Sequence, residues 1–457
     1  ANVIDLCPVG ALTSKPYAFI SRPWELSKTE SVDVMDAQGS NIRIDSRGNQ
    51  VLRVMPRLNE DVNEEWISDK ARFSIDGLKN QRLDKPYVRG VNGKLEPASW
   101  DIAFEVIAKK IKKVKPSNFG VIAGDQVDAE TMFAMKLLME KIGSPNIDCR
   151  QDGVDITGSS RTEYLFNSTI AGIDETDAIL IIGSNPRFEA PVMNARIRKR
   201  YLVGEIPIAY IGQEIDLTYP ANFLGSQASL LKEIAEGQHP FCKNLKEAQN
   251  PMIIVGNGLL SRDDTKSLLN YISEIIKKFD VVHKRWNGFN VLHSAASRVA
   301  GLDIGFLPRK SGKSAKRMLS DASSSKMGMI WLLGADEIDT SSIRNTFVVY
   351  QGHHGDVGAH CADVILPGAA YTEKNGLYVN FEGRVQEARR AIFPPGEAKD
   401  DWSIIRAFSG FIGHPLGFDN HDACRQMLVS YFPHFGEIGK IYKARWKKIG
   451  RPGKISD

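Results

Sequence analysis

The chain has 457 residues, an apolar content of 42%, a charged content of 25% and a formal net charge of +4. This length can bury a large core and favours more than one domain, while so small a charge gives no support for nucleic acid as a partner. No apolar run approaches membrane-spanning length, so we expect no direct membrane span, and five scattered cysteines argue for a reducing compartment over a disulfide framework.

Residues 1–30 are expected to form an extended lead-in, and Cys7 is its chemical feature. In ferredoxin-type clusters the last cysteine of a motif is often followed by proline, as Cys7 is by Pro8, and its thiolate binds iron. A lone cysteine is more often a small buried apolar residue, so both interpretations stay open. Because the chain starts at Ala1 without methionine, we expect a fragment that begins within a domain.

Alternating apolar residues predict a small β-rich module over residues 31–84, with strands at 32–36, 41–45 and 51–54. The sequence Ser-Arg-Gly-Asn at 46–49 has the composition of a turn between the last two strands. The module contains no cysteine, so we expect no iron–sulfur cluster in it.

From residue 85 to residue 415, apolar runs that end in glycine alternate with helical patterns, which predicts parallel, doubly wound sheets. Strands are predicted at 119–124, 177–183, 252–256 and 329–334. Ser99 and Asp128 are expected to cap helices over 101–114 and 129–142, and further helices are predicted near 192–201 and 267–277. There are enough alternating strands and helices for two subdomains, and we expect the division between them near residues 213–250.

Gly256-Asn257-Gly258-Leu259-Leu260-Ser261 is one residue short of the dinucleotide-binding fingerprint. The acid that should follow about 20 residues later is not clearly present, and Asp280 is the nearest candidate. Glycine is so common at strand-to-helix turns that ordinary packing is the favoured interpretation.

Residues 351–386 bring several glycines and polar side chains close together in the sequence. A short apolar strand at 364–366 feeds a polar, glycine-rich loop, as expected where open α/β sheets bind ligands beyond the carboxyl ends of their strands. A tight turn between core elements is the alternative. Five metal-ligand side chains also lie here, but their spacing matches no standard zinc arrangement and we expect no metal: His353, His354, Asp356, His360 and Cys361.

Two basic segments have simple interpretations. Basic residues among serines and glycines at 308–326 predict a mobile surface loop. A helix is expected from Asp401, and the C-terminal segment 416–457 ends in a basic tail over 440–454. That tail is either solvated or in contact with an acidic neighbouring subunit.

Three motifs resemble the signature of the molybdopterin oxidoreductase superfamily: A-D-V-I-L-P-G at 362–368, E-K-N-G at 373–376 and N-F-E-G-R-V-Q at 380–386. Three further segments, at 2–15, 22–25 and 63–70, are similar to the large iron–sulfur subunit of respiratory complex I. The resemblance covers nearly the whole chain. It implies a molybdopterin-oxidoreductase-like α/β fold, with residues 1–30 ending an iron–sulfur domain and the 31–84 module having lost its cluster.

The resemblance also implies that Cys7 is the fourth ligand of a [4Fe–4S] cluster, whose other three cysteines lie upstream of this chain. The whole subunit would carry further [4Fe–4S] and [2Fe–2S] clusters and no molybdenum. It would relay electrons from a flavin reduced by NADH toward quinone, as part of an NADH:quinone oxidoreductase. Residues 31–457 would be mainly scaffold, and the isolated fragment would lack activity.

Other peripheral-arm subunits of complex I, including the one that bears flavin, are the implied partners. The implied location is the cytoplasmic face of a bacterial inner membrane or the matrix face of the mitochondrial one. Three alternatives stay open: a working molybdopterin-dependent oxidoreductase resembling formate dehydrogenase, a nicotinamide-binding dehydrogenase and a purely structural assembly subunit. Cys149 follows a predicted helix, and we expect it to be a buried structural thiol and not a molybdenum ligand.

Overall fold

The computed structural model describes residues 1–343 and 345–457, and its largest sheet has seven strands, in the order β5-β4-β15-β14-β13-β6-β7. The strands are β4 (Tyr87–Arg89), β5 (Leu95–Pro97), β6 (Phe119–Ala123), β7 (Asn146–Asp148), β13 (Met329–Leu333), β14 (Phe347–Gly352) and β15 (Val364–Pro367). Strands β7, β6, β13, β14 and β15 are parallel, and the β4–β5 hairpin pairs antiparallel with β15.

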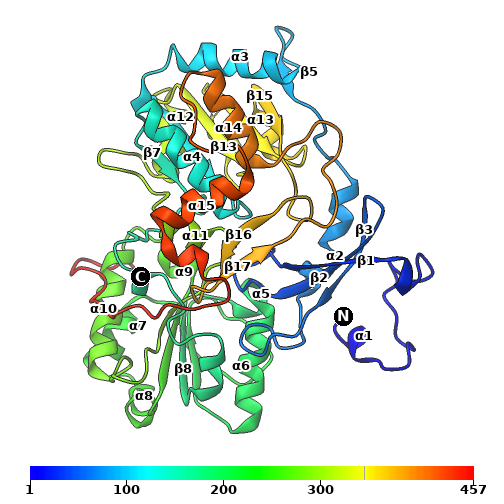
Figure 1. Ribbon diagram of the computed structural model, residues 1–457. Helices are drawn as coiled ribbons and strands as arrows, with labels where there is room; N and C mark the ends of the chain where they lie inside the picture. Colours follow the sequence, from blue (N-terminus) through cyan, green and yellow to red (C-terminus); the bar gives the residue numbers. More distant parts are fainter. Residues whose placement is uncertain (344) are drawn as a thin grey trace.

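The second sheet has five strands, in the order β10-β9-β8-β11-β12, and all of its pairings are parallel. Its strands are β8 (Ala178–Ile182), β9 (Ile208–Ile211), β10 (Asn222–Gly225), β11 (Pro251–Val255) and β12 (Phe289–Val291). Counted along the chain the order is 3-2-1-4-5, a doubly wound arrangement that reverses between β8 and β11. The predicted fold class is therefore confirmed. Figure 1 shows this sheet at the bottom of the molecule and the seven-stranded sheet at the top.

Helices connect and cover the strands of both sheets. They are α3 (Trp100–Ile111), α4 (Ala129–Ile142), α5 (Pro186–Glu189), α6 (Pro191–Val203), α7 (Ser229–Glu236), α8 (Cys242–Glu247), α9 (Asn257–Leu260), α10 (Thr265–Lys278), α11 (Arg298–Ile304), α12 (Ala315–Ser323), α13 (Val357–Cys361), α14 (Asp401–Phe411) and α15 (His421–Tyr431). As predicted, the side chains of Ser99 and Asp128 cap α3 and α4 by accepting from backbone N–H groups. None of the helices in these described ranges is long and apolar enough to cross a membrane.

The small β module is a three-stranded antiparallel sheet of β1 (Ser27–Val32), β2 (Asn41–Arg47) and β3 (Gln50–Pro56), followed by α2 (Asp69–Phe73). The predicted strand at 32–36 is wrong, because β1 ends at Val32. The Asp33 and Asp36 carboxylates instead accept from the backbone N–H groups of Met35, at 3.0 Å, and Gln38, at 2.9 Å. These local bonds favour turns over an extended strand.

A two-stranded hairpin, β16 (Gly376–Val379) and β17 (Val385–Ala388), lies between the two large sheets in Figure 1. It contacts β1 of the small module, and its first strand contacts α4 and α11. The predicted loop at 373–386 is thus largely a hairpin that joins three parts of the fold.

No single boundary in the sequence separates the residues of the two large sheets. Residues 213–250, the predicted division, hold β10, α7 and α8 of the five-stranded part. That part is inserted into the seven-stranded part, whose strands come from 87–148 and 329–367. A parallel sheet can take its strands from distant segments, and local sequence patterns do not reveal which strands pair.

Two surface predictions also differ from the structure. The predicted loop at 308–326 contains α12, capped by Ser314 and anchored by the buried Asp321, which pairs with Lys313 and Arg317 at 3.0 Å each. The C-terminal tail is not solvated throughout, because Ile449 is buried and exchanges two hydrogen bonds with the Ser273 side chain on α10.

Candidate functional site

Residues 1–24 form an N-terminal arm that carries Cys7 and is tied to the small β module. A short helix, α1 (Val3–Leu6), precedes the cysteine. The guanidinium of Arg72, on α2, pairs with the Asp5 carboxylate and donates to the Asn2 side chain at 3.0 Å. Asn2 in turn bonds both backbone groups of Ile67. These contacts hold the segment before Cys7 against the module.

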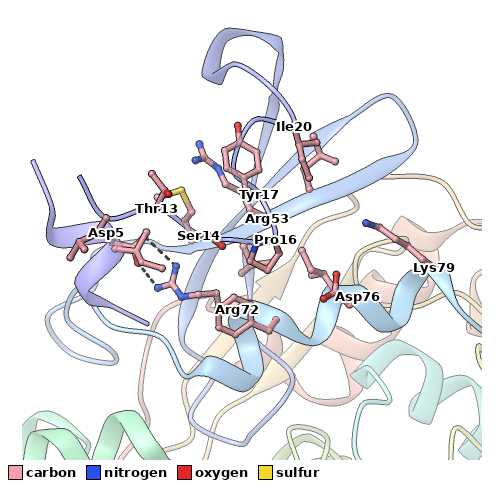
Figure 2. Close-up of a pocket in the computed structure, with 17 residues that line it drawn as sticks. Asp5, Thr13, Ser14, Pro16, Tyr17, Ile20, Arg53, Arg72, Asp76 and Lys79 are labelled. Atoms are coloured by element: carbon pink, nitrogen blue, oxygen red, sulfur yellow. Dashed lines mark hydrogen bonds and ion pairs between the residues drawn. The ribbon is translucent and has the colours of Figure 1, made fainter. Parts of the chain in front are cut away.

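Figure 2 shows the second half of the attachment, around a cavity of about 260 Å³ between the arm and the module. The Arg53 guanidinium lies 4.4 Å from the centre of the Tyr17 ring and bonds the buried Asp45 carboxylate at 2.7 Å. A cation over an aromatic face is attractive, so Arg53 links the arm to β2 and β3.

The Cys7 thiol is partly exposed and lies in a turn rich in backbone N–H groups. The N–H groups of Leu12 and Val9, with smaller contributions from Ala11 and Gly10, lower the pKa of Cys7 by stabilising the thiolate. Gly10 has φ +66°, a left-handed conformation that glycine adopts without strain. Such a turn suits a thiolate that binds a metal centre.

The arm also exposes large apolar side chains: Val3, Leu6, Val9, Phe19 and Trp24, of which Val9, Phe19 and Trp24 are each more than four-fifths exposed. A cluster of exposed apolar side chains on a soluble surface is typical of a contact with another protein surface. The arm therefore combines an apolar, exposed surface with the turn that holds Cys7.

The other four cysteines lack the lowered pKa of a reactive thiol. Cys149 is fully buried, and burial raises its pKa to about 12. Burial also raises the pKa of Cys242, Cys361 and Cys424. Over residues 1–343 and 345–457, no three His, Cys, Asp or Glu side chains gather closely enough to hold a metal ion.

A cavity of about 310 Å³ lies where the parallel strands β6, β13 and β14 reach their carboxyl ends. We call it the strand-end cavity. Residues that follow these strands and β7 line it: Asp125, Gln151, Asp336, Glu337, Gln351 and Asp356, with His353, His354, Lys374 and Asp401. This is the predicted ligand position of a doubly wound sheet, and two parts of the predicted stretch, the 351–356 segment and Lys374, meet there.

Lys374 is the one lysine or arginine among the described residues that line the strand-end cavity. It is 6% exposed, and its ammonium group lies 2.9 Å from Asp128 Oδ2 and 2.8 Å from Asp401 Oδ2. Burial opposes the charge, but the carboxylates of Asp401 and Asp128 together raise the pKa of Lys374 well above its usual value. Its charge is thus fully neutralised by the protein.

The adjacent His353 and His354 rings are nearly perpendicular, and their Nδ1 atoms lie 2.5 Å apart. His354 Nε2 donates to the Gly77 carbonyl oxygen at 2.8 Å, so His354 Nδ1 accepts from His353. Burial, with the neighbouring His354 and Lys374, holds the pKa of His353 well below its usual range. These two bonds link the loop after β14 to the short 3-10 helix Ser74–Lys79, and both ring nitrogens of His354 are used in them.

Two carboxylates of the strand-end cavity, those of Asp125 and Asp336, have raised pKa values. Burial raises the pKa of Asp125 to about 6, with Asp152 and Glu337 adding to the rise and Arg298 opposing it. Burial also raises the pKa of Asp336 to about 6, reinforced by Asp356 and Glu337. The cavity therefore has a strongly negative potential once these groups ionise.

The glycines of the five-stranded sheet pack against one another at its point of reversal. Gly258 N donates to Gly183 O at 2.8 Å, and an added Cβ at Gly256 would lie 2.4 Å from Ser184 Cβ. The Glu189 carboxylate accepts from Ser184 Oγ at 2.7 Å and from Asn185 N at 2.9 Å. These donors, which could hold an anion, already bind a carboxylate of the chain itself.

The polar residues predicted from 373 to 384 mostly hold the hairpin in place. Glu373 pairs with Arg82 at 2.6 Å, and Glu382 pairs with Arg384 at 2.8 Å. Asn380 donates to the Gln38 carbonyl oxygen at 3.1 Å. Sequence reasoning did not identify the acidic residues of the strand-end cavity. Their signal was an acid directly after an apolar run, as in Gly124-Asp125 and Ala335-Asp336-Glu337.

Comparison with known families gives two matches. Residues 82–411 match the molybdopterin oxidoreductase family model. Residues 26–76 match the model of the NADH-ubiquinone oxidoreductase NDSU1/NuoG-like, 4Fe-4S domain. The sequence has no cysteine in 26–76, so any thiolate that serves a cluster near this module comes from outside the matched segment.

Similar proteins agree with these matches. An NADH-quinone oxidoreductase subunit of Rickettsia felis is 48% identical over all of this chain and 66% of its own length. The mitochondrial NADH-ubiquinone oxidoreductase 78 kDa subunit of Candida albicans is 49% identical over 95% of this chain and 59% of its own length. The chain thus spans just under two thirds of the relatives it matches.

Among solved structures, acetylene hydratase from Pelobacter acetylenicus superimposes with a TM-score of 0.65 over 90% of this chain and 72% of the hydratase chain. The sequence identity is 14%, so this similarity concerns the fold alone.

Proposed function

The chain belongs to the molybdopterin oxidoreductase family, and from this premise we propose that it is the C-terminal part of the large iron–sulfur subunit of an NADH:quinone oxidoreductase. The proposed role of the whole subunit is to relay electrons through iron–sulfur clusters, from a flavin reduced by NADH toward quinone. Within this chain, Cys7 is the electron-transfer residue and residues 31–457 are the support.

The observation that carries the proposal is the environment of Cys7. Its thiol lies in a turn of backbone N–H groups that lower its pKa, as a thiolate ligand requires. The turn is fixed to the β module through Asp5 and Arg72 and still leaves the sulfur partly exposed. Cys7 thus fits one position of a [4Fe–4S] cluster, and we assign the other three thiolates to a part of the subunit outside this chain. We assign further [4Fe–4S] and [2Fe–2S] clusters to the same part.

The exposed apolar side chains of the N-terminal arm support a protein contact around this cluster. We assign that contact to the N-terminal iron–sulfur domain and to neighbouring peripheral-arm subunits, including the one that bears flavin. The complex would hold this chain on the cytoplasmic face of a bacterial inner membrane or on the matrix face of the mitochondrial one.

A molybdopterin nucleotide does not fit the strand-end cavity. Its pyrophosphate would meet the carboxylates of Asp125, Asp336, Glu337 and Asp356, while the cation Lys374 is already neutralised by two carboxylates. The strand-end turn at Ser184 and Asn185 likewise binds Glu189 in place of a phosphate. The negative charges of the pyrophosphate and of these carboxylates would repel strongly in a site of reduced dielectric constant. We therefore propose a scaffold without molybdenum.

The test is electron paramagnetic resonance of the reduced full-length subunit, comparing Cys7→Ser with Cys361→Ser. Cys361 is a matched control, because it is also partly exposed but bonds only the Gly358 carbonyl oxygen. We expect Cys7→Ser to lose or shift one [4Fe–4S] signal, with the other clusters unchanged and Cys361→Ser unaffected. If every cluster signal survives in Cys7→Ser, the ligand assignment is wrong and a purely structural role is favoured.

Metal analysis of the same full-length preparation tests the scaffold assignment. We expect iron and sulfide in the ratio of the clusters, with molybdenum and tungsten well below one atom per chain. A stoichiometric amount of either metal would contradict the argument from cavity charge and favour a working molybdopterin enzyme.

A further inference from the structure

The strand-end cavity offers acceptor atoms and almost no donors. Two side chains from different strands end in it with an unbonded oxygen: Gln351, which is fully buried, and Gln151, which is 7% exposed. Gln351 Nε2 donates to Asp401 O at 3.1 Å and to Asp401 Oδ1 at 3.0 Å, which fixes the amide with Oε1 as the free atom. The Gln151 amide donates to Asp125, so its oxygen is also the free atom.

A buried acceptor without a donor is costly, because it gives up its hydrogen bonds to water and gains none in return. Three such atoms gather here, because Asp125 Oδ1 is also buried and unbonded. Folded proteins rarely retain such groups together without a ligand, an ion or water to satisfy them.

Carboxylates surround the same cavity from its floor to its mouth. Asp125 and Asp336 are partly buried, and Glu337 and Asp356 are exposed at the rim. Within the described ranges, none of these four side chains forms an ion pair. Lys374 does not balance them, because Asp128 and Asp401 already neutralise it. The cavity thus combines deep amide oxygens with negative charge toward the solvent.

We propose that the strand-end cavity binds a small organic cation with at least two ammonium groups, of the polyamine class. One ammonium group donates to the oxygens of Gln151 and Gln351 at the buried end. The other pairs with the carboxylates of Asp336 and Glu337 toward the rim. Hydrogen bonds from an ammonium group to these acceptors are charge-assisted and stronger than neutral ones.

An organic cation suits the geometry better than a bare metal ion. A metal needs several ligand atoms around one point. In the described parts of the chain, no three acidic, histidine or cysteine side chains gather in that way. The acceptors are instead distributed around about 310 Å³, the size of a small-molecule site. The proposal rests on this cavity alone and does not depend on the role of Cys7.

Isothermal titration calorimetry of the protein with spermidine, at pH 7.5 and about 0.15 M salt, tests the proposal, since this salt screens exposed charges. We expect saturable binding of one spermidine per chain. The double variant Asp336→Asn/Glu337→Gln should bind at least tenfold more weakly, and Gln351→Leu should also bind more weakly. Glu214→Gln removes an exposed carboxylate outside the cavity and should bind as the wild type does.

A second measurement uses only the wild-type protein, so it holds even if a variant fails to fold. The pKa of Asp125, which faces Arg298, Asp152 and Glu337, and that of Asp336, which faces Asp356 and Glu337, are both about 6. A bound cation lowers these values, so binding should release protons at pH 6 and almost none at pH 7.5. Titrations in buffers of different ionisation enthalpy measure that release.

The outcomes separate clearly. Absence of saturable binding, equal affinity in the double variant, or no proton release at pH 6 would each overturn the proposal. Displacement of spermidine by an equal concentration of Mg²⁺ would show a general cation site and would also overturn the assignment to polyamines.

Discussion

Replacing Lys374 with methionine tests whether a buried charge network holds the hairpin segment against the two sheets. The methionine retains the apolar stem and removes only the ammonium group. That group lies 2.9 Å from Asp128 Oδ2 and 2.8 Å from Asp401 Oδ2, at 6% exposure of the lysine. The change therefore leaves two buried carboxylates without their cation.

Removal of one partner from a buried ion pair costs roughly 3–5 kcal/mol. Here one cation serves two carboxylates, so we expect Lys374→Met to lower the free energy of unfolding by about 4 kcal/mol at pH 7.5. Part of the local structure survives the change, because Asp128 Oδ1 still accepts from Thr131 N at 2.8 Å and still caps α4.

The sign of the pH dependence follows from the same geometry. Without the lysine, the folded-state pKa values of Asp128 and Asp401 rise above their unfolded values. Their contribution to stability is then present at low pH and lost as pH rises through the folded values. The loss caused by Lys374→Met should accordingly be smaller at pH 5.5 than at pH 7.5.

Urea unfolding at the two pH values measures this effect. The triple variant Lys374→Met/Asp128→Asn/Asp401→Asn should regain most of the loss, since it removes the unpaired charges. Lys277→Met is the matched control, because Lys277 is exposed and should change stability by no more than about 0.5 kcal/mol. A loss below about 1 kcal/mol for Lys374→Met at pH 7.5 would refute the reasoning.

Three further predictions concern other parts of the fold. Burial and the nearby carboxylate of Asp36 raise the pKa of Asp33 to about 8. The stabilising contribution of Asp33 is therefore lost as pH rises through about 8. Asp33→Asn should therefore stabilise the folded protein by about 3 kcal/mol at pH 8 and by much less at pH 5. Equal gains at the two pH values in thermal melts would contradict this. Ile449→Ala should lower the free energy of unfolding in urea by about 2–4 kcal/mol. Ile438→Ala, at a residue that is 51% exposed, should lower it little. Equal losses would show that the tail is not docked. Gly124→Ala places a Cβ 1.8 Å from a backbone carbonyl oxygen and should cost about 1–3 kcal/mol or more, whereas Gly410→Ala meets no atom within 4 Å and should be neutral or stabilising in the same assay.

Local elements were predictable because their signals are local. Asp128 caps α4 as predicted, and the left-handed Gly143 follows the predicted last residue, since a capping carboxylate and such a glycine act within a few residues of the helix ends. The strand at 119–123 was visible as an apolar run, because a central parallel strand is buried on both faces.

Elements that depend on distant partners were not predictable from the chain pattern. The helix α12 was mistaken for a loop because its composition is basic and serine-rich. Its fixed position depends on the ion pairs of Asp321 with Lys313 and Arg317. Docking of the tail onto its own chain was in neither of the two predicted alternatives, because its anchor, Ser273, lies on the distant helix α10.

The two candidate sites also differ in whether their sequence signals are local or come from distant segments. Cys7 could be proposed from the sequence, because Cys-Pro and its flanking residues are contiguous, and its role as a ligand stays a prediction. The strand-end cavity could not be identified, because Asp125, Gln151 and Asp336 follow three different strands and Gln351 lies near the end of a fourth. Only the strand order brings these residues to one edge of the sheet.

The insertion of one sheet into the other has a consequence for synthesis on the ribosome. Every strand of the five-stranded sheet lies between β6, which ends at Ala123, and its neighbour β13, which begins at Met329. The inner sheet can therefore be complete while β6, although paired with β7, still lacks its other neighbour β13 and α4 lacks α11 and α14. Pairings between distant segments form slowly, and exposed strand edges aggregate while they wait. The outer sheet is thus the late step of folding, and the nascent chain most needs a chaperone between the emergence of β6 and that of β15.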